Sequence, residues 1–430
     1  MKRNCLILCL SLLLLLGGCG KPVREPSETV TQPIPEPTVT AGTETTVPET
    51  TVETIGETMP VMLSVPEAEL LEKGTGFFKG KEDVSWNLTD SKDVTRVALQ
   101  AGEGLRLESE RPFAGVYIRW EKIPGTCLLQ TDDWQREYST GGYLHEFIGL
   151  EAPVSRLELV PGETCEIAGI FLFTEGTVPG WVQVWQPPCE QADLLVFPTH
   201  SDDDALFFGA LIAHYAVERG LTVQTAFMTD HWYEPIRNHE RLDGLWEMGV
   251  RHYPVVGTAR DYNAPSLNQA IHYHKEDDIL GWQVEQLRRF RPLVAVGHDI
   301  RGEYGHQQHI LNTMYLIDAV SLASDGSQYP ESAERYGVWD TPKLYLHLYG
   351  EDAPAMEVNT PLSADREGRT AFQIAVDAYG HHKSQHQYYF QVQQGREYPQ
   401  TDCSWFGLYR STVGEDSSWD VMEHTEAVRN

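Results

Sequence analysis

Basic residues are scarce in this chain. Its 430 residues contain 33 Lys and Arg against 63 Asp and Glu, which gives a formal net charge of −30. No run of Lys and Arg is long enough to make a basic patch. A field of this sign repels phosphate backbones, so we expect no nucleic-acid partner.

Cysteine is also rare, with seven in the whole chain, so the protein is not a disulfide scaffold. No C-x-x-C pair occurs, which disfavours a zinc site built from thiolates. Cys127, Cys165, Cys189 and Cys403 are widely spaced. The sequence allows one disulfide among them but does not indicate which two residues would form it.

The chain begins with an apolar run too short for a permanent membrane span, which needs about 20 residues. Lys2 and Arg3 precede this run at 6–16, in the pattern of a secretory signal. The run ends in "LGGC", which resembles the lipobox of bacterial lipoproteins and places the lipidated thiol on Cys19. We expect 1–19 to be a lipoprotein signal peptide, so that the mature chain is lipid-anchored to the cell membrane on its extracytoplasmic face. An ordinary signal peptide, or a buried helix with an incidental cysteine, is the alternative.

Large side chains are almost missing from 20–65, which is composed mainly of Pro, Thr, Glu and Val. Such a segment cannot bury enough apolar surface to offset its chain entropy. Its prolines keep it extended. We interpret it as a disordered linker between the anchor and the folded part.

Short alternating segments follow in 66–185, for example at 115–120, 155–160 and 167–173. Each carries β-branched and aromatic residues at every second position, and turn residues separate them. This pattern predicts a small all-β sandwich, serving as a glycan-binding accessory or a spacer. Three tryptophans of this segment form either a sugar-stacking face or core and rim positions: Trp86, Trp120 and Trp134.

The pattern changes in 190–425, where apolar runs lack clean alternation. Such runs are typical of strands covered on both faces, and a helical pattern at 204–220 lies between the first two. The sequence therefore predicts an α/β domain with a Rossmann-like, doubly wound, mostly parallel sheet. Its expected strands are 193–197, 222–228, 252–257, 293–297 and 343–350.

Chemistry-bearing side chains follow two of these strands, where ligands bind in such sheets. The first strand is followed by His200, Asp202 and Asp203, and the fourth by His306 and His309. Two imidazoles and one carboxylate, without thiolates, suit a catalytic zinc ion that keeps one coordination position open for water. The same ligands equally suit a ferrous ion bound by a facial triad. Calcium would require more oxygen ligands. A spare carboxylate beside the metal can accept a proton from an attacking water.

The two motifs, "HSDDD" at 200–204 and "HDIRGEYGHQQH" at 298–309, together resemble the LmbE-like or PIG-L family of zinc-dependent N-acetylglucosaminyl deacetylases. The resemblance covers roughly 190–425. It implies that His200, Asp203 and His309 bind zinc. It also implies that Asp202 is the general base.

By the same resemblance, His306 acts as the acid or as the electrostatic partner of the reacting carbonyl, and Tyr304 hydrogen-bonds the oxyanion. Arg237 and Glu240 match a segment at the family's substrate pocket, and His382 is expected at the pocket edge. An exposed ion pair between Arg237 and Glu240 is the alternative.

The chain also departs from the family pattern. Ser201 and Gln307 replace prolines, and Asp204 replaces a glutamate. Gln308 replaces the aspartate that would pair with His306, and the candidates to replace that carboxylate are Asp299 and Glu303.

The sequence thus predicts a membrane-anchored zinc hydrolase that cleaves the acetyl amide of an N-acetylated sugar or glycoconjugate, with Fe²⁺ as the alternative metal. Two other functions remain open at this stage. One is a non-catalytic, metal-stabilised lipoprotein that binds a glycan or another solute. The other is a ferrous oxygenase, although such enzymes usually place their ligands on the strands of a jelly roll.

Overall fold

The computed structural model describes residues 65–90, 92 and 94–428, which belong to one structural unit of the chain. The predicted signal peptide with Cys19, and the predicted linker apart from Val65, lie outside the described residues. Within the described part, no helix has both the length and the apolar character needed to cross a membrane.

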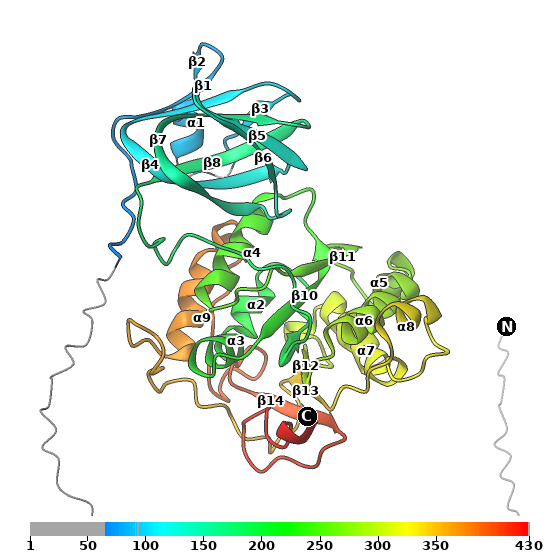
Figure 1. The fold of residues 1–430 in the computed structure, drawn as a ribbon. Helices are drawn as coiled ribbons and strands as arrows, with labels where there is room; N and C mark the ends of the chain where they lie inside the picture. The colour runs from blue at the N-terminus through cyan, green and yellow to red at the C-terminus, as the bar shows by residue number, and fades with distance from the viewer. Residues whose placement is uncertain (1–64, 91, 93, 429–430) are drawn as a thin grey trace, which may run out of the picture. The chain divides into compact units, whose positions relative to one another are not determined.

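The N-terminal part of the described chain, up to Phe173, forms an antiparallel sheet of eight strands (Figure 1). The strands pair in the order β2-β1-β4-β7-β5-β6, and β8 pairs with both β3 and β4. The register of β4 against β7 shifts between Glu108 and Gly115, which marks a bulge where a strand bends. That these strands form a two-layered sandwich stays a prediction, as do the predicted domain boundaries. The elements are β1 (Thr75–Lys79), β2 (Glu82–Asp83), α1 (Ser85–Thr89), β3 (Val97–Leu99), β4 (Leu105–Lys122), β5 (Thr126–Gln130), β6 (Gln135–Ser139), β7 (His145–Pro161) and β8 (Cys165–Phe173).

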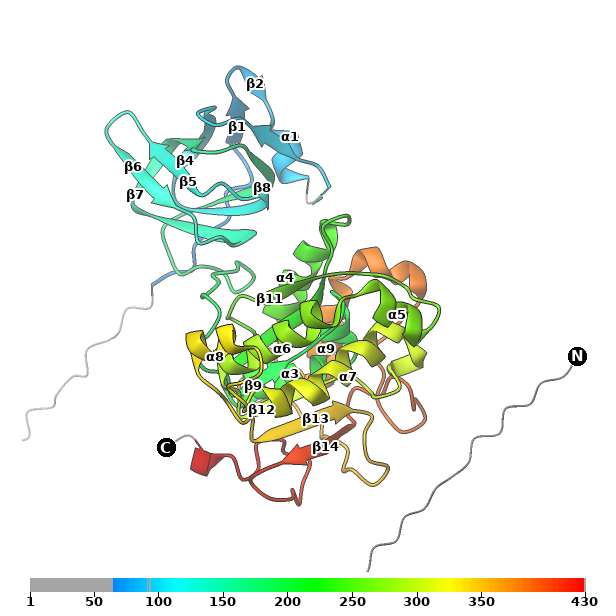
Figure 2. The ribbon, with the colours of Figure 1, turned by 90° about the vertical axis from the view of Figure 1, so that its right-hand side faces the viewer.

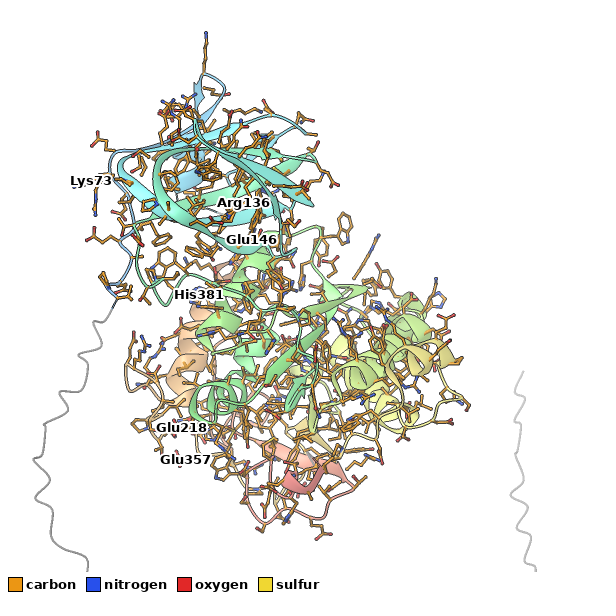
Figure 3. All side chains as sticks on the ribbon, in the orientation of Figure 1. Lys73, Arg136, Glu146, Glu218, Glu357 and His381 are labelled. Atoms are coloured by element: carbon orange, nitrogen blue, oxygen red, sulfur yellow. The ribbon has the colours of Figure 1, made fainter. Side chains whose placement is uncertain are left out.

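The three tryptophans of this sheet do not share one environment. Trp120 is fully buried in the core, and its indole N–H donates to Glu146, which is labelled in Figure 3, over 3.1 Å. Trp134 is partly buried against the same core, whereas Trp86 is 74% exposed. Trp120 is therefore a core residue and takes no part in a sugar-stacking face.

The remaining part contains a six-stranded sheet in the order β11-β10-β9-β12-β13-β14. All neighbours are parallel except β13 and β14, which are antiparallel. The predicted α/β class with a mostly parallel sheet is confirmed. The strands are β9 (Leu194–Val196), β10 (Val223–Asp230), β11 (Val255–Arg260), β12 (Val294–Gly297), β13 (Lys343–His347) and β14 (Phe406–Ser411).

Helices cover both faces of this sheet, as Figures 1 and 2 show. Consecutive residues of β9 enter different cores: Leu194 and Val196 pack with α3 and α9, and Leu195 packs with α6 and α7. This alternation explains why the strand sequences are apolar throughout. The helical elements are α2 (Asp203–Leu206), α3 (Gly209–Ala213), η1 (His214–Glu218), α4 (Ile236–Glu247), α5 (Leu267–Tyr273), α6 (Glu276–Phe290), η2 (Glu303–Gly305), α7 (Gln307–Leu322), α8 (Pro330–Tyr336), α9 (Ala371–Gly380), η3 (Lys383–Tyr388) and η4 (Glu426–Val428).

The segment 204–220 is mostly helical, as predicted, but it does not form one continuous helix. The segment forms two short α-helices, α2 and α3, and then a π-helical turn, η1. The break falls at Phe207 and Phe208, which are both buried against histidines of β13 and of the segment that follows β12. In one continuous helix, two adjacent side chains point about 100° apart. The turn between α2 and α3 allows the rings of both Phe207 and Phe208 to be buried.

The described cysteines Cys127, Cys165, Cys189 and Cys403 are all buried free thiols. The disulfide that the sequence allowed among them is absent from the described structure.

Candidate metal centre and active site

The candidate site lies where the strand order of the six-stranded sheet reverses. After β9 the chain continues outward through β10 and β11, and it then returns to place β12 on the other side of β9. The loops that follow β9 and β12 therefore leave adjacent parallel strands in different directions, which opens a crevice at their carboxyl ends. His200 and Asp203 come from the first loop, and His309 from the helix that follows the second.

The three predicted metal ligands converge. The Nδ1 atom of His200 lies 3.1 Å from Nε2 of His309, and each of these nitrogens lies 3.3 Å from Oδ2 of Asp203. Ligand atoms at about 2.1 Å from a tetrahedral zinc would lie about 3.4 Å apart. The predicted ligand set therefore fits a single small divalent ion.

Hydrogen bonds fix which nitrogen of each imidazole carries its proton. Nδ1 of His309 donates to a carboxylate oxygen of Glu303 over 2.6 Å, so its Nε2 keeps a lone pair. Nε2 of His200 lies 3.1 Å from the amide oxygen of Gln308, which also accepts from the Tyr262 backbone N–H. The proton of His200 is thus on Nε2, and its Nδ1 keeps a lone pair.

Two imidazole lone pairs and one carboxylate oxygen consequently face one another inside the protein. Without a cation among them, a proton has to bind there. Burial alone would lower the pKa of His309, but Asp203 and Glu303 raise it to about 10. Burial alone would raise the pKa of Asp203, but His309 and His200 lower it well below its usual value. Both shifts have the same cause, an anionic cluster that attracts positive charge.

Other side chains could share the ion. Nitrogens of His306 and His298 lie close enough to those of His309 to join it in a metal site, His306 together with His200 and His298 together with Asp203. Nε2 of His298, however, already accepts the backbone N–H of Thr199, and its Nδ1 donates to a carboxylate. His306 is different, because its buried Nδ1 has no hydrogen-bond partner in the described structure.

Glu303 holds this group of histidines in place, and the sequence did not indicate this role. One of its oxygens accepts from Nδ1 of His298 over 3.0 Å and from His309, and the other accepts from Nδ1 of His347 over 2.8 Å and from the Asp299 backbone N–H. The carboxylate is fully buried. Of the two acids expected to pair with His306, Glu303 instead orients the metal ligand His309.

A glycine permits the sharp loop that delivers Glu303. Gly302 has a φ of 72°, and a Cβ at this position would lie 2.6 Å from Cγ1 of Ile310 at the start of α7. Only a residue without a side chain allows this loop to approach the helix so closely.

Gln308 also has a role that the sequence reasoning missed. It was expected to stand where an aspartate pairs with His306. The structure instead places its amide against His200, and the amide nitrogen donates to the Arg260 carbonyl and to Nε2 of His274. Gln308 therefore orients a metal ligand.

The predicted base, Asp202, is paired with a cation. Its Oδ1 accepts from Nη2 of Arg237 over 2.8 Å, and Nη1 of Arg237 donates to Asp261 over 3.1 Å. Burial raises the pKa of Asp202, and Arg237 opposes that rise. Asp261, which follows β11, also lies 3.5 Å from Nε2 of His200, so it connects the arginine to the metal ligands.

The structure contradicts the alternative interpretation of Arg237 and Glu240 as an exposed ion pair. Both side chains are about 95% buried and have separate partners. Glu240 accepts from the backbone N–H of Ser384 over 2.7 Å and from its hydroxyl over 2.6 Å. Arg237 therefore reaches the site through Asp202, while Glu240 anchors the segment around Ser384.

His382 is not at a pocket edge. Its imidazole is fully buried, and Nε2 lies 3.8 Å from Oδ1 of Asp204, which is also fully buried. The predicted place of His382 at a pocket edge is therefore wrong, because its ring has no exposed surface. A Cβ on Gly244 of α4 would come within 3.0 Å of its Nε2, so this glycine makes room for the ring.

His306 and Tyr304 border the metal ligands from the η2 loop. The His306 ring lies 4.8 Å from that of His200 and 4.5 Å from that of His309. Burial lowers the pKa of His306 to about 2, and the two neighbouring imidazoles reinforce this shift. The His306 ring is therefore neutral near pH 7. Tyr304 is 40% exposed, with its ring 5.8 Å from that of His309. These two side chains lie between the ligands and the solvent.

No protein-family model matches this chain. Several curated proteins are similar to it. A 1D-myo-inositol 2-acetamido-2-deoxy-α-D-glucopyranoside deacetylase of Mycobacterium leprae is 30% identical over 194 residues, which cover 38% of this chain and 62% of that protein. One from Saccharopolyspora erythraea is 30% identical over 172 residues, or 34% of this chain and 61% of that protein. These relatives are deacetylases. The chain spans slightly under two thirds of their length.

Solved structures are similar at a lower level. The N,N′-diacetylchitobiose deacetylase of Pyrococcus horikoshii is 19% identical, with 46% of this chain and 73% of that chain covered and a TM-score of 0.34. A deacetylase of the teicoplanin biosynthesis pathway is 18% identical, with 45% and 85% covered and a TM-score of 0.29.

Proposed function

We propose that this protein is a metal-dependent deacetylase that hydrolyses the acetyl amide of an N-acetylglucosamine-type sugar or glycoconjugate, with zinc as the metal. The curated relatives support the reaction class, since each is named for removing an acetyl group from a 2-acetamido sugar conjugate. The donor set supports the metal.

The observation that carries the proposal is the convergence of lone pairs. His200, Asp203 and His309 direct three electron-pair donors to one point, within 3.1–3.3 Å of one another. A protein gains nothing from burying such a group unless a cation binds there. The ligand types match a catalytic zinc site that leaves a position open.

A metal ion bound by these ligands would supply a water of lowered pKa and would polarise the amide carbonyl. Asp202 lies next to the ligand Asp203 and accepts the proton of the attacking water. Arg237 donates to Asp202 over 2.8 Å and so holds the carboxylate in one orientation. The amide C–N bond then breaks, and the proton held by Asp202 is available to the departing amine, giving acetate and a free amino sugar.

His306 and Tyr304 act on the other side of the carbonyl. His306 is neutral, so one ring nitrogen carries an N–H that can donate to the carbonyl oxygen as this oxygen gains negative charge. The hydroxyl of Tyr304 can donate to the same oxygen. Burial, reinforced by Asp203 and Asp202, raises the pKa of Tyr304, which keeps its proton in place.

The location of the reaction belongs to the proposal as well. Residues 1–65 are expected to carry the chain across the membrane and to tether it outside through lipidated Cys19. The substrate is then a sugar that is accessible at the outer face of the cell membrane. Incorporation of a labelled fatty acid that is lost on Cys19→Ser tests this part alone.

Acetate release tests the activity. The purified chain, loaded with zinc, is incubated with N-acetylglucosamine, its oligomers and N-acetylglucosaminyl conjugates, and free acetate is measured. We expect release from at least one substrate, loss of release after chelation, and recovery on adding zinc. Recovery with ferrous iron alone would instead support a ferrous enzyme.

Two variants separate catalysis from binding. Asp202→Asn should retain the metal and lose turnover by roughly 100-fold or more, as expected for removal of a general base. His200→Ala should lose the metal. No acetate from any substrate of the panel, with metal bound, would leave the protein a metal-stabilised binding protein and overturn the proposal.

A further inference from the structure

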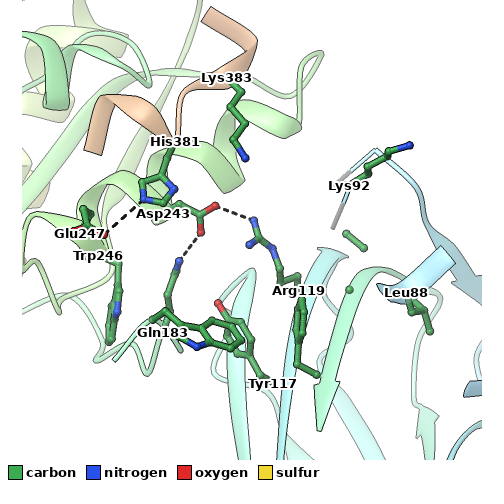
Figure 4. Close-up of a pocket in the computed structure, with 14 residues that line it drawn as sticks. Leu88, Lys92, Tyr117, Arg119, Gln183, Asp243, Trp246, Glu247, His381 and Lys383 are labelled. Carbon is green, nitrogen blue, oxygen red and sulfur yellow. Dashed lines mark hydrogen bonds and ion pairs between the residues drawn. The ribbon is translucent and has the colours of Figure 1, made fainter. Parts of the chain in front are cut away.

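A cavity of about 290 Å³ lies outside the metal centre (Figure 4). One wall comes from β4 and β8 of the antiparallel sheet, and the other from α4 and the segment 381–383. None of the proposed metal ligands lines it. Its volume is at the lower end of the range for small-molecule sites, about 300–1,000 Å³.

Aromatic rings form one side of this cavity. Trp181 is 48% exposed although it is a large apolar side chain. Its ring lies 6.0 Å from that of Tyr117 and 5.7 Å from that of Phe171, both in edge-to-face geometry. The two neighbours hold the indole in one position and leave part of its surface open. A fixed and partly open indole is suited to packing against a flat ligand with apolar C–H groups.

Charged and amide groups form the opposite side. Asp243 accepts from Nη2 of Arg119 over 3.0 Å and from the amide of Gln183 over 2.6 Å (Figure 4). This carboxylate is therefore already balanced by a cation. The second acid of the cavity, Glu247, is balanced by His381.

Two lysines, Lys92 and Lys383, also line the cavity. Figure 4 shows Lys383 extending toward the pair of Asp243 and Arg119, whereas the ammonium group of Lys92 points away from this pair. Among the residues that the structure describes, no carboxylate forms an ion pair with Lys383. Lys383 therefore offers the cavity a positive charge with which a bound anion can pair.

We propose that this cavity binds an acidic sugar, with its ring against Trp181 and its carboxylate or phosphate on Lys383. The aromatic wall accounts for the sugar ring, the carboxylate of Asp243 for its hydroxyls, and Lys383 for its charge. The inference does not depend on the proposed deacetylase activity.

The helix α4 contributes to both the cavity and the metal centre. Its residues Arg237, Glu240, Asp243 and Glu247 recur at spacings of three and four and therefore follow one stripe of the helix. Arg237, at the start of this stripe, contacts Asp202, whereas Asp243 and Glu247, later in the helix, line the cavity. None of the proposed metal ligands lines the cavity, and a ligand there would contact the antiparallel sheet and the α/β part together.

Calorimetric titration of the full chain tests the proposal with three ligands of one sugar series. These are a trisaccharide of mannuronic acid, mannose 6-phosphate and neutral mannotriose. We expect saturable binding of at least one charged ligand, and at least tenfold weaker binding of mannotriose. Whichever charged ligand binds more tightly shows whether the site prefers a carboxylate or a phosphate.

Lys383→Ala and Trp181→Ala should each weaken binding of the charged ligand by about tenfold or more, as for loss of a charge-assisted hydrogen bond or a buried ring contact. The matched controls are Lys81→Ala and Trp86→Ala, two exposed residues of the same types that do not line the cavity. Thermal unfolding of each variant confirms that it is folded. Equal binding of the neutral sugar, absence of binding by all three ligands, or equal effects of the control substitutions would each overturn the proposal.

Discussion

The strongest prediction concerns Glu303→Gln, which keeps the size of the side chain and removes its charge. The carboxylate accepts four N–H groups, from His298, His309, His347 and the Asp299 backbone. An amide has one oxygen to offer, and its NH₂ group would face the N–H groups on the other side. Whichever way the amide is oriented, two of the four donors lose their acceptor.

The magnitude follows from the ligand that is affected. With its Nδ1 proton no longer held, His309 can place the proton on Nε2, the atom that faces Asp203, and it then no longer binds a metal. Removing such an orienting carboxylate typically weakens metal binding by about 10–100-fold, or about 1.4–2.7 kcal/mol. Each buried donor left without an acceptor costs a further ~1–3 kcal/mol of folding stability.

Competition with a chromophoric chelator measures this loss directly and does not depend on turnover. We expect the zinc dissociation constant to increase by 10–100-fold in Glu303→Gln and to be unchanged in Glu331→Gln, an exposed residue of α8. A thermal melt shows whether the variant is folded. A zinc affinity within twofold of the wild type in folded Glu303→Gln would refute the assignment of Glu303 as the residue that orients the ligand.

Three further predictions concern other parts of the chain. Asp202→Asn should bind zinc at least as tightly as the wild type, because it removes a base and not a ligand; a metal content below half would contradict this role. Hydrogen bonds from His381 and then Arg369 lower the pKa of Glu247 to about 2. The charged Glu247 therefore stabilises the folded state fully above about pH 4.5, and this stabilisation is lost as the pH falls toward 2. Glu247→Gln should therefore lower the free energy of unfolding by on the order of 1 kcal/mol at pH 7 and by progressively less at pH 4 and 3, because solvent screens this partly exposed pair; an effect that does not change with pH would contradict the assignment. Burial raises the pKa of three thiols to about 12, so peptide mapping should find them unmodified by iodoacetamide at pH 8 until denaturant is added: Cys127, Cys165 and Cys189.

The sequence predicted that the three proposed ligands would come together, because each motif is short and follows a recognisable strand. His200 and Asp203 are three residues apart at the end of β9, and His309 opens a helix after β12. In a doubly wound sheet these two strand ends can only meet at the reversal of strand order. Knowledge of the two strands was therefore enough to bring the three side chains together.

The supporting residues could not be predicted in this way, because their contacts depend on loop conformation. Glu303 reaches three histidines through a loop that begins with the positive φ of Gly302, and one of these, His347, is on a different strand. Asp261 reaches Arg237 and His200 from the end of β11. Glu303 and Asp261 share one feature with the proposed ligands, since each follows the carboxyl end of a parallel strand. This feature could have identified the two acids as candidate site residues, but it could not have identified the side chains that they contact.

The helix α4 shows where the sequence left two interpretations open. A pattern of Arg and Glu three residues apart, such as Arg237 and Glu240, normally describes a solvated helix face. In this protein the antiparallel sheet contacts α4 through Asp243, and the active-site loops contact it through Arg237. The charged residues of α4 therefore pair with other elements and not with one another. Tertiary contacts bury these positions, which local spacing alone would place at the surface.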